Sequence, residues 1–190
     1  MRVLDLRRYR LLFLFIAICI VFGVIMLACN FVLRILYPLH YENLIKKYSQ
    51  EYDLDPLFVA SIIRAESKFD ANAVSPKGAK GLMQIASITG KWASEELNIL
   101  QYNEHMLFNP NINIKIGCWY LNKLNKEFNN NTENVLASYN AGSGNVTKWL
   151  KNNKYSIDGT KLNEIPFAET REYIKRVNRN YNIYKYLYKK

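Results

Sequence analysis

The hydrophobic pattern divides the chain into two parts. Residues 11–33 form a long apolar stretch without a charged residue. As a helix rising about 1.5 Å per residue, this stretch would span roughly 35 Å, enough to cross the hydrocarbon core of a bilayer. From residue 41 onward, apolar positions instead recur at three- and four-residue spacing, which is typical of amphipathic helices. No alternating pattern long enough for a strand is present, so we predict an all-α or nearly all-α domain over residues 41–190.

Capping residues, prolines and glycines divide the second part into its expected helices. Asp55 and Pro56 predict a helix start, because Asp can cap free amides and Pro fixes a helical φ at the first position. Thr132 is expected to cap another helix, and Pro166 to begin the last one. The remaining predicted helices cover residues 41–52, 81–85, 89–97, 111–128 and 145–150.

The helix that begins at Pro56 carries an acid on its apolar face. Val59, Ile62, Ile63 and Glu66 lie on one side of that helix, with Glu66 at its end. Burial and the negative end of the helix dipole both disfavour a carboxylate, so we predict a raised pKa for Glu66. A protonated carboxyl in an apolar setting can donate a proton to a glycosidic oxygen. Periodicity alone leaves a second interpretation open, because a Glu at a helix end is commonly solvated or acts as a capping partner.

Three further motifs follow Glu66-Ser67 in order. They are Gly81-Leu82-Met83-Gln84, Ala137-Ser138-Tyr139-Asn140-Ala141-Gly142 and Glu169-Thr170-Arg171-Glu172-Tyr173. Together the four motifs resemble the soluble lytic murein transglycosylase family over residues 41–184. The third motif departs from the family's usual form only at Ser138, where Ala is common. The resemblance implies a single lysozyme-like catalytic domain.

The resemblance also implies a mechanism with one acid. Glu66 would protonate the leaving oxygen, then act as base on the 6-hydroxyl of the same N-acetylmuramic acid, giving a 1,6-anhydromuramyl end without water. Tyr139 is expected to hydrogen-bond Glu66, and Gly81 to let the backbone approach the sugar. The residue types leave Met83 open as core filling and Ser67 as a helix cap. The predicted substrate-binding residues are Ser67, Gly81, Met83, Gln84, Tyr139, Asn140, Glu169 and Tyr173.

Charge asymmetry around the apolar stretch predicts its orientation. Four arginines precede it within residues 1–10, whereas only Arg34 follows closely. The positive-inside rule then gives a cytoplasmic basic segment 1–10, a single-pass transmembrane helix or signal anchor at 11–36, and an extracytoplasmic catalytic domain at the cell membrane. A cleaved signal peptide is a second interpretation. A lipoprotein is a third, because Cys29 ends a sequence that loosely resembles a lipobox.

Composition and cysteine positions restrict the partners. The 190-residue chain has 26 Lys and Arg against 16 Asp and Glu, a net charge of +10. This surplus suits an anionic wall or membrane surface, and because no nucleic-acid motif is present we expect no nucleic acid partner. Cys118 stands alone in the outer domain, without metal-ligand spacing, so we expect no metal and no cofactor.

We therefore predict a monomeric enzyme that acts on peptidoglycan glycan strands. Two alternatives remain from the sequence. The first is a hydrolytic muramidase of the same fold, which adds water to the same bond. The second is a non-catalytic glycan-binding or scaffold module, which would have no need of the acid at Glu66.

Overall fold

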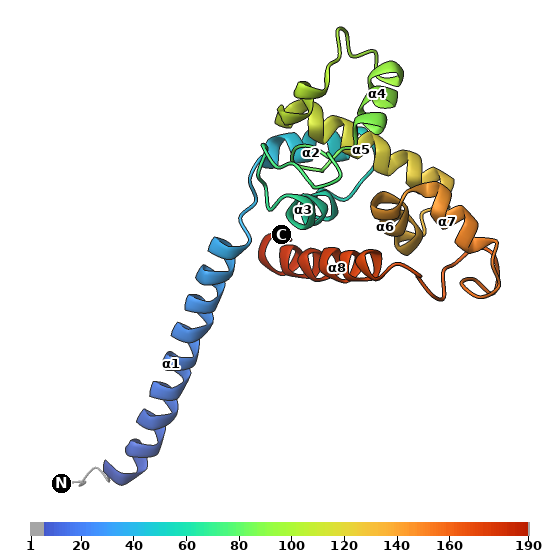
Figure 1. Cartoon of the computed structure of the whole chain (residues 1–190). Helices are drawn as coiled ribbons and strands as arrows, with labels where there is room; N and C mark the ends of the chain where they lie inside the picture. Colours follow the sequence, from blue (N-terminus) through green and yellow to red (C-terminus); the bar gives the residue numbers. More distant parts are fainter. Residues whose placement is uncertain (1–5, 190) are drawn as a thin grey trace. The chain divides into compact units, whose positions relative to one another are not determined.

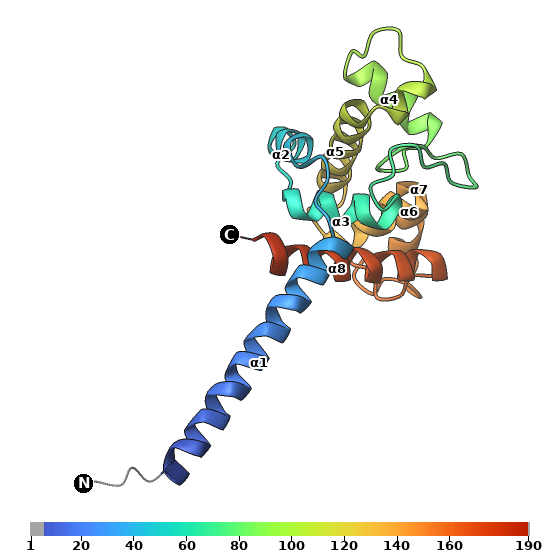
Figure 2. The ribbon, with the colours of Figure 1, turned by 90° about the vertical axis from the view of Figure 1, so that its left-hand side faces the viewer.

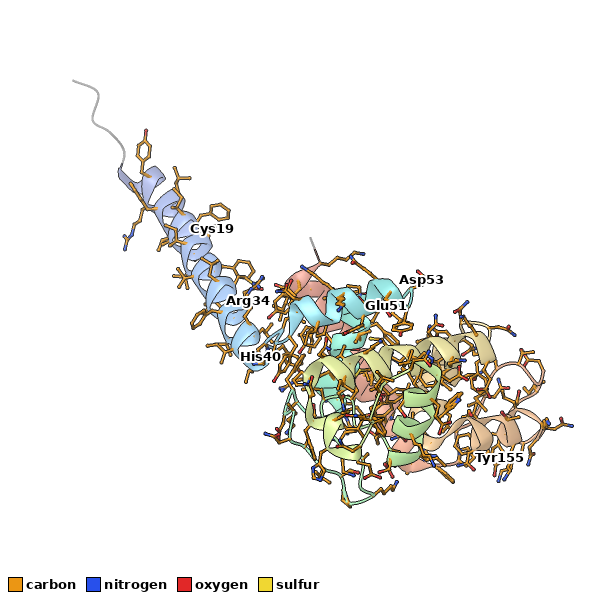
Figure 3. The ribbon with its side chains drawn as sticks, turned by 90° about the horizontal axis from the view of Figure 1, so that it is seen from above. Cys19, Arg34, His40, Glu51, Asp53 and Tyr155 are labelled. Carbon is orange, nitrogen blue, oxygen red and sulfur yellow. The ribbon has the colours of Figure 1, made fainter. Side chains whose placement is uncertain are left out.

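The computed structural model describes residues 6–189, and the chain divides into two compact units, Met1–Pro38 and Leu39–Lys190. The first unit contains helix α1 (Leu6–Leu36), whose side chains project on all sides, as at Cys19 and Arg34 in Figure 3. Its stretch Leu12–Leu36 has a mean hydropathy of 3.1 and is not buried within the protein. By length and composition this helix is able to cross a membrane. The basic segment predicted at residues 1–10 lies partly outside the described residues.

The second unit is helical (Figure 1). Its elements in chain order are α2 (Glu42–Glu51), α3 (Pro56–Glu66), α4 (Ser87–Glu96), the 3-10 helix η1 (Glu104–Phe108), α5 (Pro110–Glu127), α6 (Thr132–Ala141), α7 (Ser143–Leu150) and α8 (Ala168–Tyr188). Within residues 6–189 there is no strand, and extended pairing is limited to isolated bridges of Lys80 with Val74 and with Ile85. The all-α prediction is confirmed.

Helix α3 lies at the centre of this unit, packed along α8, as Figures 1 and 2 both show. The predicted apolar face of α3 is the packed face, because Val59, Ile62 and Ile63 are each 0% exposed. Helix α5 contacts α2, α4 and α6, and so connects these three helices to one another. The predicted start of α3 is also confirmed, since the Asp55 carboxylate accepts a hydrogen bond from the Leu57 amide at 2.7 Å.

The structure corrects three element boundaries. The helix predicted at 81–85 is a turn, because Gly81 and Gln84 have φ values of 77° and 48° that a right-handed helix does not allow. Helix α6 is capped by the side chain of Asn131, which accepts from the Asn134 amide at 3.1 Å, and not by Thr132. The last helix begins at Ala168, two residues after Pro166.

Candidate active site

The acid predicted from the pattern lies where three helices meet. Glu66 ends α3, Tyr139 lies near the end of α6, and Tyr173 lies near the start of α8. Both α3 and α6 pack against α8 (Figure 1). The fold thus gathers one carboxyl and two phenol groups from segments far apart in the sequence, and each of these groups acts electrostatically on another.

The surroundings of Glu66 favour its protonated form. Burial raises the pKa of Glu66 to about 7 from an ordinary value of 4.5, which confirms the predicted direction. Opposing this, the Tyr173 hydroxyl and the Arg176 guanidinium lower the pKa, and the Glu169 carboxylate adds a smaller rise. The residue as a whole keeps intermediate exposure, although protein atoms surround most of its carboxyl. Glu66 is therefore sheltered but still reachable from outside.

The hydroxyl groups of Tyr139 and Tyr173 interact with groups other than those predicted. The Tyr139 hydroxyl donates a hydrogen bond to the Met83 carbonyl at 2.9 Å, so the predicted bond from Tyr139 to Glu66 is absent. Instead, the Tyr173 hydroxyl is the phenol group that lowers the pKa of Glu66. This hydroxyl is buried and has no hydrogen-bond partner among the described residues. The pKa of each phenol is raised, chiefly by burial and then by the Glu66 charge.

A tight loop from Gly81 to Gln84 forms one side of the site. Asn113 of α5 holds this loop, because its side-chain oxygen accepts from the Met83 amide at 2.8 Å and its amide nitrogen donates to the Leu107 carbonyl at 2.7 Å. A Cβ on Gly81 would collide with the Leu107 carbonyl and with Asn113. The lack of a side chain at Gly81 thus lets the backbone lie close to protein atoms. The expectation was that it would let the backbone lie close to the sugar.

Three residues predicted to bind substrate are enclosed within the fold. The Met83 side chain is 0% exposed and packs on Gly117, so it is core filling. Ser67 is the C-cap of α3, and its hydroxyl donates to the Leu82 carbonyl at 2.8 Å, which ties the helix to the loop. Tyr173 is 1% exposed and interacts electrostatically with Glu66. These three residues therefore support Glu66 and the loop from Gly81, and direct contact with a sugar is not expected of them.

The other predicted residues keep groups available to a ligand. The amide nitrogen of Gln84 donates to the carbonyls of Gly81 and Ala73, and within residues 6–189 its side-chain oxygen accepts no hydrogen bond. The Asn140 oxygen accepts from Thr170 at 2.7 Å, and no hydrogen bond from its amide nitrogen is present in that part of the chain. Gln84 therefore presents an acceptor and Asn140 a donor, the two groups that a sugar acetamide requires.

The last motif is anchored by exposed charges. Glu169 forms an ion pair with Lys77 at 3.1 Å, and both side chains are largely exposed. Arg171 donates to the carbonyls of Ile165 and Pro166 at 2.5 and 3.0 Å, so it braces the chain that leads into α8. Glu169 remains accessible to a ligand, whereas Arg171 has a structural role.

Two residues near the acid were missed by the sequence analysis. Arg176, on α8, supplies the cation that the face of α3 itself lacks. It had no signal in the sequence, because its distance from Glu66 depends on how α8 packs on α3. Asn113 had one: it is an amide at a core position of a helix, 0% exposed between apolar neighbours, and such groups require internal hydrogen bonds.

Cavities elsewhere in the domain do not contain the predicted residues. One of about 510 Å³ lies between α5, α6 and α7, and one of about 620 Å³ lies beside α4 and η1. Neither is lined by Glu66 or by a residue of the four motifs. We place the site at Glu66 because acid–base chemistry needs a titratable group poised near neutral pH, which Glu66 supplies.

Comparison with known families shows which family the chain belongs to. The family model named Transglycosylase SLT domain matches residues 43–160, more than half of the chain. The chain belongs to this family. The part of the chain that matches the SLT domain includes Glu66, the loop from Gly81 and Tyr139, whereas Glu169 and Tyr173 lie beyond it.

Individual SLT relatives include both soluble and membrane-bound proteins. The soluble lytic murein transglycosylases of Salmonella typhimurium and Escherichia coli are 38% identical over 143 residues, covering 74% of this chain and 22% of theirs. The membrane-bound lytic murein transglycosylase C of Cronobacter sakazakii is 27% identical over 173 residues, covering 76% of this chain and 46% of the relative. The chain thus spans about a fifth of the length of the soluble relatives.

Solved structures confirm the lysozyme-like fold of the SLT domain. The lytic transglycosylase Slt of Pseudomonas aeruginosa, solved as an inactive Glu-to-Gln mutant, has a TM-score of 0.71 at 32% identity, covering 81% of this chain and 25% of that protein. The 70-kDa soluble lytic transglycosylase of Escherichia coli has a TM-score of 0.71 at 34% identity over the same shares. Its complex with bulgecin A is equally similar, with a TM-score of 0.72.

Proposed function

We propose that this chain is a peptidoglycan lytic transglycosylase that cleaves the β-1,4 bond between N-acetylmuramic acid and N-acetylglucosamine. The observation that carries the proposal is the Glu66 carboxyl, whose pKa burial raises to about 7. A group with that pKa donates and recovers a proton at neutral pH with little thermodynamic cost in either direction. Membership of the SLT family and the similarity to proteins named lytic murein transglycosylases support the substrate class.

The reaction needs two proton transfers at one carboxyl. Glu66 first gives its proton to the glycosidic oxygen as the bond from C1 to that oxygen breaks, which releases N-acetylglucosamine as an alcohol. The 6-hydroxyl of the same N-acetylmuramic acid then bonds to C1, and the Glu66 carboxylate takes the hydroxyl proton. The product is a 1,6-anhydromuramyl end, no water is consumed, and the enzyme returns to its starting state.

The surroundings of Glu66 suit both halves of this cycle. Burial favours the acid before the first transfer, and the Tyr173 hydroxyl and Arg176 guanidinium favour the carboxylate that exists between the transfers. Gln84 and Asn140 would hold the acetamide group that helps to stabilise the cationic centre at C1. Because Glu66 acts first as an acid and then as a base, both of its protonation states must be stabilised, which burial alone does not do.

Most hydrolytic glycosidases use a second carboxylate. Asp70 and Glu169 are both exposed and engaged with other groups, so neither has the buried setting of Glu66. Asp70 is exposed, and its carboxylate accepts from the Asn72 amide at 2.9 Å within a turn. Glu169 is exposed and paired with Lys77. This favours the single-acid mechanism over the hydrolytic muramidase. One similar protein, the lytic transglycosylase Slt of Pseudomonas aeruginosa, was solved as an inactive Glu-to-Gln mutant, so a single Glu is essential in that protein.

The proposal includes attachment to a membrane. Helix α1 has the length and composition to cross a bilayer, and some relatives are named as membrane-bound. The arginines before it favour a cytoplasmic N-terminus, which would place residues 41–190 outside the cytoplasm as a monomer beside the wall.

Product masses test the proposed function. Purified peptidoglycan is digested with the wild-type chain, with Glu66→Gln, and with Glu172→Gln as a control that alters an exposed acid on α8. We expect anhydro ends, one water lighter than reducing ends, from the wild type and the control, and no release from Glu66→Gln. Reducing ends would show hydrolysis instead, and full activity of Glu66→Gln would refute the mechanism.

A further inference from the structure

A row of aromatic rings leads away from the site toward α4. Trp92 of α4 lies 6.3 Å from Tyr120 of α5, and Tyr120 lies 5.6 Å from Tyr139 of α6, measured between ring centroids. The Glu66 charge in turn adds to the rise in the pKa of the Tyr139 hydroxyl, so the two groups lie close together. Three helices therefore contribute one continuous series of rings that ends at the acid. We call Trp92, Tyr120 and Tyr139 the aromatic row.

The three residues of the aromatic row keep some exposure, although the hydroxyls of Tyr120 and Tyr139 are buried enough to raise their pKa, and Trp92 is the most open of the three. Trp92 is 41% exposed, and Tyr120 and Tyr139 have intermediate exposure. By contrast, Trp119, whose ring contacts that of Trp92, is 5% exposed. Large apolar side chains held open to solvent in a series next to a candidate site are typical of a ligand-binding surface.

The outermost ring is held in place. Trp119 packs against Trp92 edge to face, with centroids 4.7 Å apart and an interplanar angle of 72°. The Lys123 ammonium lies 5.7 Å from the Trp92 centroid and is itself paired with Glu96 at 3.0 Å. Because its orientation is fixed by these neighbours before any ligand arrives, Trp92 loses little conformational entropy on binding.

We propose that the aromatic row is a stacking surface for a β-1,4-linked, N-acetylated glycan strand, extending the site from Glu66 to Trp92. The apolar faces of pyranose rings pack on aromatic rings, and a strand with repeating rings matches a series of aromatic side chains. The assignment of the glycan rests on the proposed function. What it adds is a binding site on α4 and α5, outside the four motifs, that makes affinity depend on strand length.

The test measures binding without cleavage. The full chain carrying Glu66→Gln is held in detergent micelles and titrated with chitin oligosaccharides, β-1,4-linked oligomers of N-acetylglucosamine. We expect the hexasaccharide to bind more tightly than the trisaccharide. Adding Trp92→Ala should weaken hexasaccharide binding about tenfold and abolish that gain, because a stacked ring buries apolar area on both partners. The matched control, Phe167→Ala, removes a 47% exposed aromatic residue outside the row and should change neither affinity.

A second measurement needs no substitution at Trp92 and guards against misfolding. N-bromosuccinimide oxidises accessible indoles, and peptide masses report the extent at each Trp. We expect the hexasaccharide to slow oxidation of Trp92 in the full chain, while the trisaccharide protects it much less. Equal hexasaccharide affinity with Trp92→Ala, or unprotected Trp92 at saturation, overturns the inference. If the wild type releases no muropeptides but the row still binds glycan, the proposed function fails and the aromatic row stands.

Discussion

Replacing the acid should stabilise the protein at alkaline pH. In the folded state burial raises the pKa of Glu66 to about 7, whereas an exposed Glu titrates at 4.5. The favourable contribution of the neutral carboxyl is fully present below pH 4.5 and is lost as the pH rises through about 7. Glutamine keeps the shape and never ionises. Glu66→Gln should therefore remove the destabilisation of the folded state that ionisation of Glu66 causes in the wild type as the pH rises.

The magnitude follows from the displacement of the pKa. A change from 4.5 to about 7 corresponds to about 3 kcal/mol of unfolding free energy between acidic and alkaline solution. This is an upper value, because Glu66 keeps intermediate exposure and water screens part of its charge. About 3 kcal/mol is a substantial fraction of the stability of a domain of this size, so the effect is measurable.

Denaturant unfolding at two pH values measures this effect. The compact unit Leu39–Lys190 is unfolded at about pH 5 and about pH 8.5 with and without Glu66→Gln. We expect the unfolding free energy of Glu66→Gln, relative to that of the wild type, to be higher at about pH 8.5 than at about pH 5. Glu172→Gln is the control: Lys175 lowers the pKa of Glu172, so its replacement should not benefit the protein at high pH. A Glu66→Gln difference that is the same at both pH values would refute the reasoning.

Two further predictions concern the surroundings of the acid. Arg176→Gln removes a cation that lowers the pKa of Glu66, so the fall of activity on the alkaline side should move to higher pH, while Arg179→Gln on the same helix leaves the pH–rate profile in place. An unshifted profile in Arg176→Gln would contradict the assigned contact. Gly81→Ala places a Cβ against the Leu107 carbonyl at a φ of 77°, so the loop should shift, with a loss of several kcal/mol of stability and of most activity. Thermal unfolding and muropeptide release measure both effects, and a wild-type melting temperature would show that the loop accommodates the methyl group.

Local periodicity was enough to predict most of the helices and the place of Glu66 on α3, although the helix predicted at 81–85 is a turn. The spacing of Val59, Ile62 and Ile63 identified the buried face of α3, because a helix brings such positions to one side whatever surrounds it. Asp55 and Pro56 identified its start for an equally local reason. The loop at Gly81 was not predictable in this way, since its positive φ values depend on Asn113, thirty-odd residues further along the chain.

The tertiary structure decided which groups act on the acid. The family resemblance predicted a hydrogen bond from Tyr139 to Glu66. Packing of α6 directs the Tyr139 hydroxyl to the Met83 carbonyl, and packing of α8 brings Tyr173 and Arg176 to the Glu66 carboxyl instead. The pattern along one helix can predict burial, because burial depends on that helix's own apolar face. It cannot predict proton affinity or hydrogen-bond partners, because these depend on distances of a few ångströms between helices that only the packed fold sets.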